Sequence, residues 1–129
     1  LLSGVRVVDL TTSIAGPYAA LLLADMGAEI VKVERPGAGD DSRAWGPPFL
    51  DGESLWFLSV NRNKRSITLD YSGEAGRAVL HDLVRTADVV IVSAWNDAPN
   101  CSGVRFSPAK GKNASRASNW RDRSHRGQL

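Results

Sequence analysis

The chain contains 129 residues, with 16 lysines and arginines against 14 aspartates and glutamates, which gives a formal net charge of +2. This length suits one modest domain and argues against two full ones. No run of about 18 apolar residues is present, and residues 1–10 lack the pattern of a signal peptide. The single cysteine, Cys101, excludes an internal disulfide and a cysteine-rich metal site. These features favour a cytoplasmic protein that does not contact a membrane.

The average charge conceals two unlike segments. Residues 1–93 hold 9 basic and 12 acidic residues (net −3), whereas residues 94–129 hold 7 basic and 2 acidic residues (net +5). The second segment contains only two residues of the Val/Ile/Leu/Met group, Val104 and Leu129. Because so few apolar side chains cannot offset the entropy of ordering the chain, we interpret 94–129 as a disordered basic tail. The foldable unit is then 1–93.

The start of the chain predicts one β-α-β unit. Residues 5–10 are rich in β-branched side chains, which favours a buried strand, and residues 28–33 repeat that pattern. Between them lies a helical run at 18–26, which Pro17 opens and Gly27 ends, the usual asymmetry of helix termini. A single helix between two buried strands implies a parallel pair with a right-handed crossover.

A second unit follows. Its expected parts are a loop at 36–50, a short helix at 53–60, a strand at 67–70, a helix at 73–85 and a strand at 88–92. Ser72 is placed to cap the longer helix. Two such units predict an α/β fold with a partial Rossmann-like parallel sheet of at least four strands. Because parallel sheets need cover on both faces, we expect a partner chain or further sequence to complete that cover.

Ligands of doubly wound folds bind at the carboxyl ends of the strands. The loop at 11–17 leads into a helix N-terminus, so it is either an ordinary turn or a source of backbone N–H groups for an anion. Its single glycine disfavours nicotinamide or flavin binding. After the second strand, Arg35 offers a fork of donors that matches a phosphate. Arg62, Lys64 and Arg65 form another basic cluster, which is either a phosphate site or a solvated turn.

Several short motifs follow one another in a recognisable order. They are LSGVRVVDL at 2–10 with AGP at 15–17, LADMGAEIVKVERPGAG at 23–39, DDSRAW at 40–45, NRNKRSITLD at 61–70 and ADVV at 87–90. Together they resemble the start of family III CoA-transferases, the CaiB/BaiF type. The resemblance implies that 1–93 is the N-terminal part of the family's large domain. After residue 92 the family's usual Asn-Phe-Arg-Pro-Gly segment is replaced, so 94–129 is predicted to be a non-family tail, disordered or translated out of frame.

The resemblance also implies a binding site for CoA or acyl-CoA as substrate, with no metal. The matching positions are Ser13, Ile14, Ala15, Arg35, Leu69 and Ser72. The first three correspond to the loop that contacts the nucleotide and thioester end of CoA, and the arginine to the residue that meets the adenosine phosphate. The leucine matches an adenine-pocket position, and Ser72 stands where some members have a lysine.

Members of the resembled family transfer CoA between carboxylic acids through an aspartyl-CoA thioester intermediate. Their catalytic aspartate lies beyond the matching residues, so we assign no catalytic residue and expect the chain to be inactive alone. We predict an N-terminal fragment of a CoA-transferase, with acyl-CoA and a carboxylic acid as partners and a homodimer as in the family. The alternatives are an α-methylacyl-CoA racemase-type member, an inactive CoA-binding remnant, and a nucleic-acid binder using the basic tail, for which no recognition motif is present.

Overall fold

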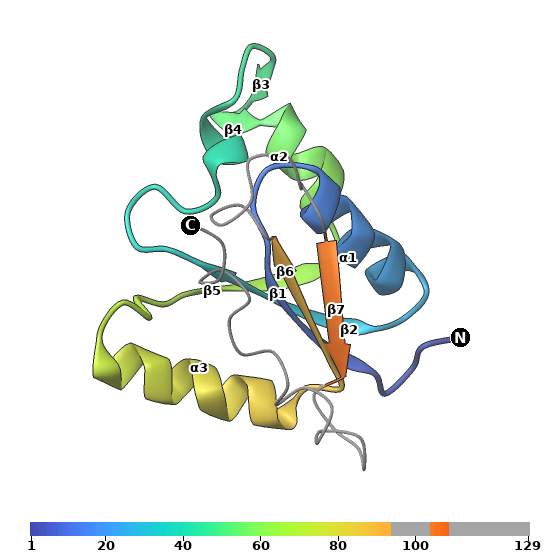
Figure 1. Cartoon of the computed structure of the whole chain (residues 1–129). Helices are drawn as coiled ribbons and strands as arrows, with labels where there is room; N and C mark the ends of the chain where they lie inside the picture. The colour runs from blue at the N-terminus through green and yellow to red at the C-terminus, as the bar shows by residue number, and fades with distance from the viewer. Residues whose placement is uncertain (94–103, 109–129) are drawn as a thin grey trace, which may run out of the picture.

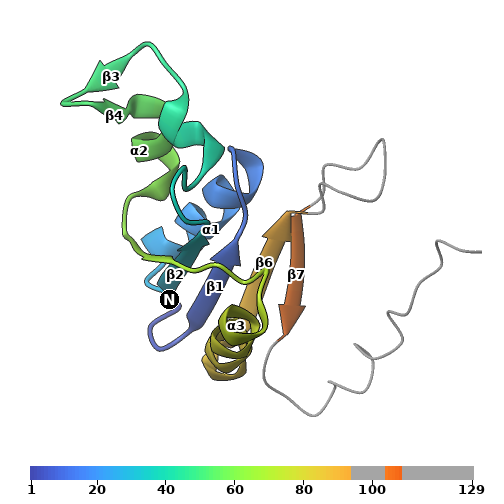
Figure 2. The same cartoon turned by 90° about the vertical axis from the view of Figure 1, so that its left-hand side faces the viewer.

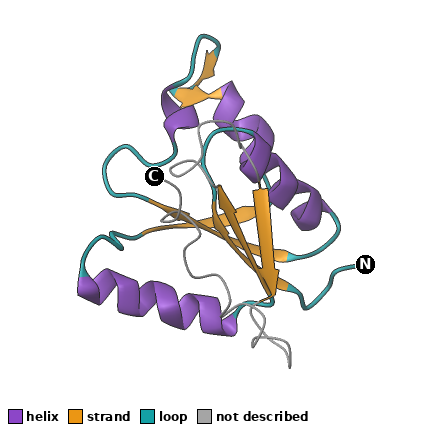
Figure 3. Cartoon of the chain, viewed as in Figure 1, coloured by secondary structure: helices purple, strands orange, loops and turns teal. Residues whose placement is uncertain are grey.

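The computed structural model describes residues 1–93 and the backbone of 104–108, and it shows a five-stranded sheet with helices on both faces (Figure 1). In chain order the elements are β1 (Arg6–Leu10), α1 (Ala15–Asp25), β2 (Glu29–Glu34), the 3-10 helix η1 (Asp41–Ala44), β3 (Phe49–Leu50), β4 (Glu53–Ser54), α2 (Leu55–Asn61), β5 (Lys64–Thr68), α3 (Glu74–Thr86), β6 (Val89–Ser93) and β7 (Val104–Pro108). Figure 3 colours the helices and strands separately. The predicted α/β class is confirmed.

The sheet has the order β5-β2-β1-β6-β7, and its first four strands run parallel. Numbered by their appearance in the chain, these four strands have the order 3-2-1-4 of a Rossmann half. The chain therefore reverses its direction across the sheet after β5, and the switch point lies between the neighbouring strands β1 and β6. Crossovers of one hand then place α1 and α3 on opposite faces of the sheet, as Figures 1 and 2 show.

The core consists of two apolar layers because alternate residues of each strand point to opposite faces. The layer on the α1 side contains Val7, Ala20, Ala24, Ala28, Ile30 and Ile91. The layer on the α3 side contains Val8, Val33, Ala87 and Val90, against which Leu80, Leu83 and Val84 of α3 pack. No residue of α3 is fully buried. Within the described part of the chain, the α3 face of the sheet is thus only partly covered.

Three local predictions differ from the structure. β5 begins at Lys64, earlier than predicted, so this lysine and Arg65 lie within the strand rather than before it. Helix α1 begins at Ala15, which puts Pro17 in the first turn, where a backbone N–H is not needed. Gly73, not Ser72, is the N-cap of α3. Ser72 instead donates its Oγ–H and N–H to the Asp70 carboxylate, a competing local bond that such short polar side chains often make.

β7 lies within 94–129, the segment for which the sequence predicted no ordered structure. It pairs antiparallel with β6, from Val89 opposite Pro108 to Ser93 opposite Val104. Pairing at a sheet edge uses main-chain hydrogen bonds, so it is possible in a segment with few apolar side chains. The rest of 94–129 lies outside the described residues. In the described part, no helix is long and apolar enough to cross a membrane.

Candidate functional site

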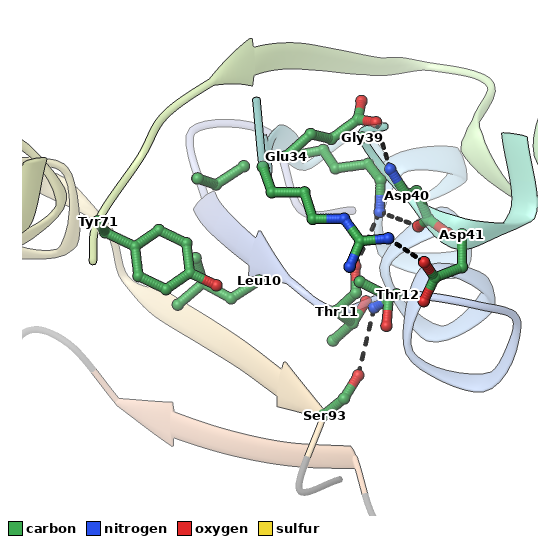
Figure 4. A pocket seen from close by; sticks show the side chains of 12 residues that line it. Leu10, Thr11, Thr12, Glu34, Gly39, Asp40, Asp41, Tyr71 and Ser93 are labelled. Atoms are coloured by element: carbon green, nitrogen blue, oxygen red, sulfur yellow. Dashed lines mark hydrogen bonds and ion pairs between the residues drawn. The ribbon is translucent and has the colours of Figure 1, made fainter. Parts of the chain in front are cut away.

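A cavity of about 310 Å³ lies at the carboxyl ends of β1, β2 and β6, where the strand order reverses. It is lined by Leu10, Thr11 and Thr12, by residues 32–35 of β2 and its end, and by Gly39, Asp40, Asp41, Tyr71 and Ser93. Figure 4 shows Tyr71 and Leu10 toward one end, Asp40 and Asp41 toward the other, and Ser93 facing Thr12. This is the position at which doubly wound sheets bind their ligands.

The loop between β1 and α1 forms one wall of the cavity, and side chains hold its backbone in place. The bonds are Thr11 N–H to Asp9 Oδ1 (3.0 Å), Thr12 N–H to Ser93 Oγ (3.3 Å), Ser13 N–H to Asp40 Oδ1 (3.0 Å) and Lys32 Nζ to the Thr11 carbonyl (2.8 Å). The sequence left open that the N–H groups of this loop bind an anion. For residues 11–13 that interpretation is wrong, because side chains of the protein already accept those hydrogen bonds.

A buried ion pair lies directly beneath this loop. Lys32 Nζ is 2.7 Å from Asp40 Oδ2, and the two side chains are 1% and 0% exposed. Asp40 Oδ1 also accepts bonds from the Ser42 N–H (2.9 Å) and Oγ–H (2.7 Å). Burial alone would raise the pKa of Asp40, but the hydrogen bond and charge of Lys32, together with Ser42, lower it. Asp40 is thus held as a carboxylate.

Next to this pair, Glu34 anchors the loop that follows β2. Arg43 Nε and Nη2 donate to its two oxygens at 2.7 and 2.8 Å, and the Arg43 guanidinium lies 3.7 Å from the centre of the Phe57 ring. Ser66 Oγ–H and the Asp40 N–H add two further bonds. Burial opposes ionisation, but these hydrogen bonds and the Arg43 charge lower the pKa of Glu34 to about 2.

Arg35 lies at the cavity with its side chain 56% exposed, and it forms an ion pair with Asp41. Both side chains are close to half exposed, so solvent screens their attraction. An anionic ligand that entered the cavity could therefore replace part of the contact between the Arg35 guanidinium and Asp41. Arg35 is therefore the lining residue best suited to bind a phosphate.

Comparison with known proteins gives the family. The model of CoA-transferase family III matches residues 2–107. The chain belongs to that family. Over 90 residues it is 53% identical to the mouse (Mus musculus) succinyl-CoA:glutarate CoA-transferase. This alignment covers 70% of this chain and 21% of the relative. It is 54% identical over 102 residues to the succinate–glutarate CoA-transferase of Agrobacterium fabrum, covering 74% of this chain and 26% of the relative.

A solved structure shows the same fold. The crystal structure of a CaiB/BaiF family protein from Brucella suis superimposes with a TM-score of 0.66 at 47% identity, covering 70% of this chain and 25% of that one. The chain thus spans about a quarter of the length of these CoA-transferase relatives. The match of the family model continues past residue 93, into the segment that contains β7.

Of the six positions matched to CoA contacts of the family, Arg35 lines the cavity. Ser13 follows the lining residue Thr12, and Ile14 and Ala15 are the N-cap and first residue of α1. Leu69 packs against the apolar layer under α3, and its N–H donates to the Glu34 carbonyl (2.9 Å). Ser72 is exposed and bonded to Asp70.

The other basic cluster, Arg62, Lys64 and Arg65, does not line this cavity. Lys64, with a side chain 2% exposed, lies 3.0 Å from Asp9 Oδ2 and donates to the Pro17 carbonyl and Asn61 Oδ1, both at 2.8 Å. Burial lowers the pKa of this lysine, against the charge of Asp9. Arg62 pairs with Asp25 and Arg65 with Glu29. Lys64 is therefore buried and paired, whereas Arg62 and Arg65 are exposed ion-pair partners as Arg35 is. Arg35 differs from them in that it lines the cavity.

Tyr71 and Ser93 line the cavity although the sequence did not select them as binding residues. Both come at or just after the carboxyl end of a strand, the one signal that points to them.

Proposed function

We propose that this chain is the CoA-binding, N-terminal part of an enzyme that transfers CoA from an acyl-CoA to a carboxylic acid. The observation that carries the proposal is the cavity at the switch point of the sheet, with Arg35 on its wall. Membership of CoA-transferase family III supplies the ligand class. A phosphorylated nucleotide suits this position because Arg35 can donate two parallel hydrogen bonds to one phosphate group.

In this proposal the described residues bind CoA and do not perform the covalent chemistry. Arg35 binds the 3′-phosphate of the adenosine unit, exchanging part of its contact with Asp41 for contact with the ligand. Ser13, Ile14 and Ala15 face the thioester end, as their match to the family implies. The aspartate nucleophile belongs to sequence that this chain does not match. We therefore expect the isolated chain to bind CoA without turning over an acyl-CoA.

Transfer is favoured over racemisation, because both relatives compared above are named as CoA-transferases that act on succinyl and glutarate groups. Other similar proteins are named for oxalate or mesaconate, so the acceptor acid varies within the family. We therefore propose the reaction class, transfer of CoA between carboxylic acids, for the complete enzyme. A homodimer remains part of the proposal, and it would supply further cover for the sheet.

Titration calorimetry with CoA on the full 129-residue chain tests the proposal. Arg35→Ala should weaken CoA binding by about tenfold or more, the effect of losing a charge-assisted bond. Arg62→Ala is the matched control, because its side chain is 58% exposed and likewise paired with an aspartate, Asp25. No binding at millimolar CoA would refute the proposal, as would an equal loss in the control.

Dephospho-CoA, which lacks the 3′-phosphate, locates the contact. The unaltered chain should bind it about as weakly as Arg35→Ala binds CoA, and the variant should not distinguish the two ligands. If Arg35→Ala still prefers CoA to dephospho-CoA by the same factor as the unaltered chain, the guanidinium does not contact that phosphate.

A further inference from the structure

The β1–α1 loop at residues 11–13 is fixed by residues that lie far from it in the sequence. Asp40, from the loop after β2, accepts the Ser13 N–H at 3.0 Å. Lys32, on β2, donates to the Thr11 carbonyl at 2.8 Å. These two side chains also pair with one another at 2.7 Å. One buried ion pair therefore holds the loop at both ends, through a carbonyl at one side and an N–H at the other.

The backbone of this loop needs such support. Ser13 has a φ of 70°, in the left-handed region that side-chain-bearing residues seldom adopt. A conformation of this kind persists only where its surroundings impose it. The Asp40 bond to Ser13 N–H supplies that constraint directly, and the next residues begin α1.

The burial of the pair indicates a geometric role. Removing two charges from water largely cancels their attraction, so a buried ion pair adds little net stability compared with apolar residues of the same size. What it does provide is direction, because each charge here also forms a hydrogen bond to the loop. Asp40 further accepts two bonds from Ser42, which fix the position of its carboxylate.

We infer that the Lys32–Asp40 pair positions the β1–α1 loop for ligand binding, so that the cavity wall is already formed before CoA arrives. The two residues are positioning residues: they act through the backbone of 11–13. The inference rests on the proposed function only for the identity of the ligand. The ordering of the loop itself is a property of the free chain.

The first test measures the free chain by amide hydrogen exchange. In Lys32→Met, the protection of the Ser13 amide should fall by about tenfold relative to that of Val8 in β1, which reports on the core. Ile30→Val is the matched control: it shortens a fully buried side chain on β2, the strand that carries Lys32, without removing any bond to the loop. It should lower overall stability but leave the Ser13-to-Val8 ratio unchanged.

The second test measures CoA affinity under conditions in which each variant is folded. Lys32→Met should raise the Kd about tenfold, and Ile30→Val should leave it within about twofold of the unaltered chain. Asp40→Asn serves as a second variant if Lys32→Met does not fold, because the amide keeps an oxygen acceptor but loses the ion pair. It should change both readouts in the same direction.

The outcomes separate the two proposals. If the unaltered chain does not bind CoA, the proposed function fails, while the exchange ratio still decides the role of the pair. If CoA binds but Lys32→Met and Asp40→Asn leave both affinity and exchange ratio unchanged, the positioning role is overturned and the function stands. An equal change in Ile30→Val would show general destabilisation, which also overturns it.

Discussion

Glu34→Gln should destabilise the chain in a pH-dependent way. The Glu34 carboxylate is 4% exposed and is held by Arg43 from one side and Ser66 from the other. Its pKa falls from 4.5 to about 2 on folding, because these bonds outweigh the cost of burial. A lowering of about 2.5 pKa units corresponds to about 3 kcal/mol of stability at pH 7.

The sign of the pH dependence follows from the lowered pKa. A carboxyl group that is more acidic in the folded state stabilises that state fully above its unfolded pKa, 4.5. The stabilisation is lost as the pH falls from there through about 2. At pH 3 we expect about 1.4 kcal/mol of the original 3 to remain.

Urea unfolding of the unaltered chain and of Glu34→Gln, followed by tryptophan fluorescence at pH 7 and pH 3, measures how much unfolding free energy the variant loses at each pH. Glu29→Gln is the control: its carboxylate is also paired with arginines, Arg6 and Arg65, but it is exposed. That variant should have a much smaller effect, because solvent screens exposed pairs. The reasoning is refuted if the Glu34→Gln difference is the same at both pH values, or no larger than that of Glu29→Gln.

Two further changes test the same anchor. Gly39→Ala should lower the free energy of unfolding by about 1 to 3 kcal/mol, since the added Cβ would lie 2.7 Å from Glu34 Oε2 at a φ of 66°. Gly37→Ala is the control, because its φ of 79° is similarly positive but no atom lies close to the added Cβ. Thermal unfolding should show a smaller loss of stability in Gly37→Ala than in Gly39→Ala. Arg43→Lys keeps the charge but loses the two parallel bonds to Glu34, and should cost about 1 to 2 kcal/mol in urea unfolding. An unchanged midpoint in Arg43→Lys would show that charge alone suffices.

The fold could be predicted because its signals are local. β-branched runs at β1, β2 and β6 and an Ala/Leu-rich helix between the first two imply parallel strands, since so short a crossover has few other solutions. Errors arose where two local signals competed. The β-branched pattern of Ile67 and Thr68 favours a strand at 67–70, whereas β5 begins at Lys64, in a stretch whose charged side chains are equally typical of a solvated turn.

The site was predicted only in part for the same reason. Arg35 was found because it follows a strand directly, a signal visible in sequence. Asp40, in contrast, reads as a hydrated acid on a Gly/Pro-rich loop, yet it is fully buried against Lys32. Nothing in the local sequence shows that pairing, because it depends on how the loop after β2 folds back over the sheet.

The sequence by itself determined the α/β class, the parallel strands and the family, because periodicity and motif order are properties of neighbouring residues. Only the tertiary structure decided which charges are available. Lys64, an equal candidate with Arg35 by composition, is buried against Asp9 of β1, whereas Arg35 is half exposed at the cavity beside Asp41. The physical reason is that the free energy of a charge depends on burial and on partners from distant segments, which the fold alone brings together.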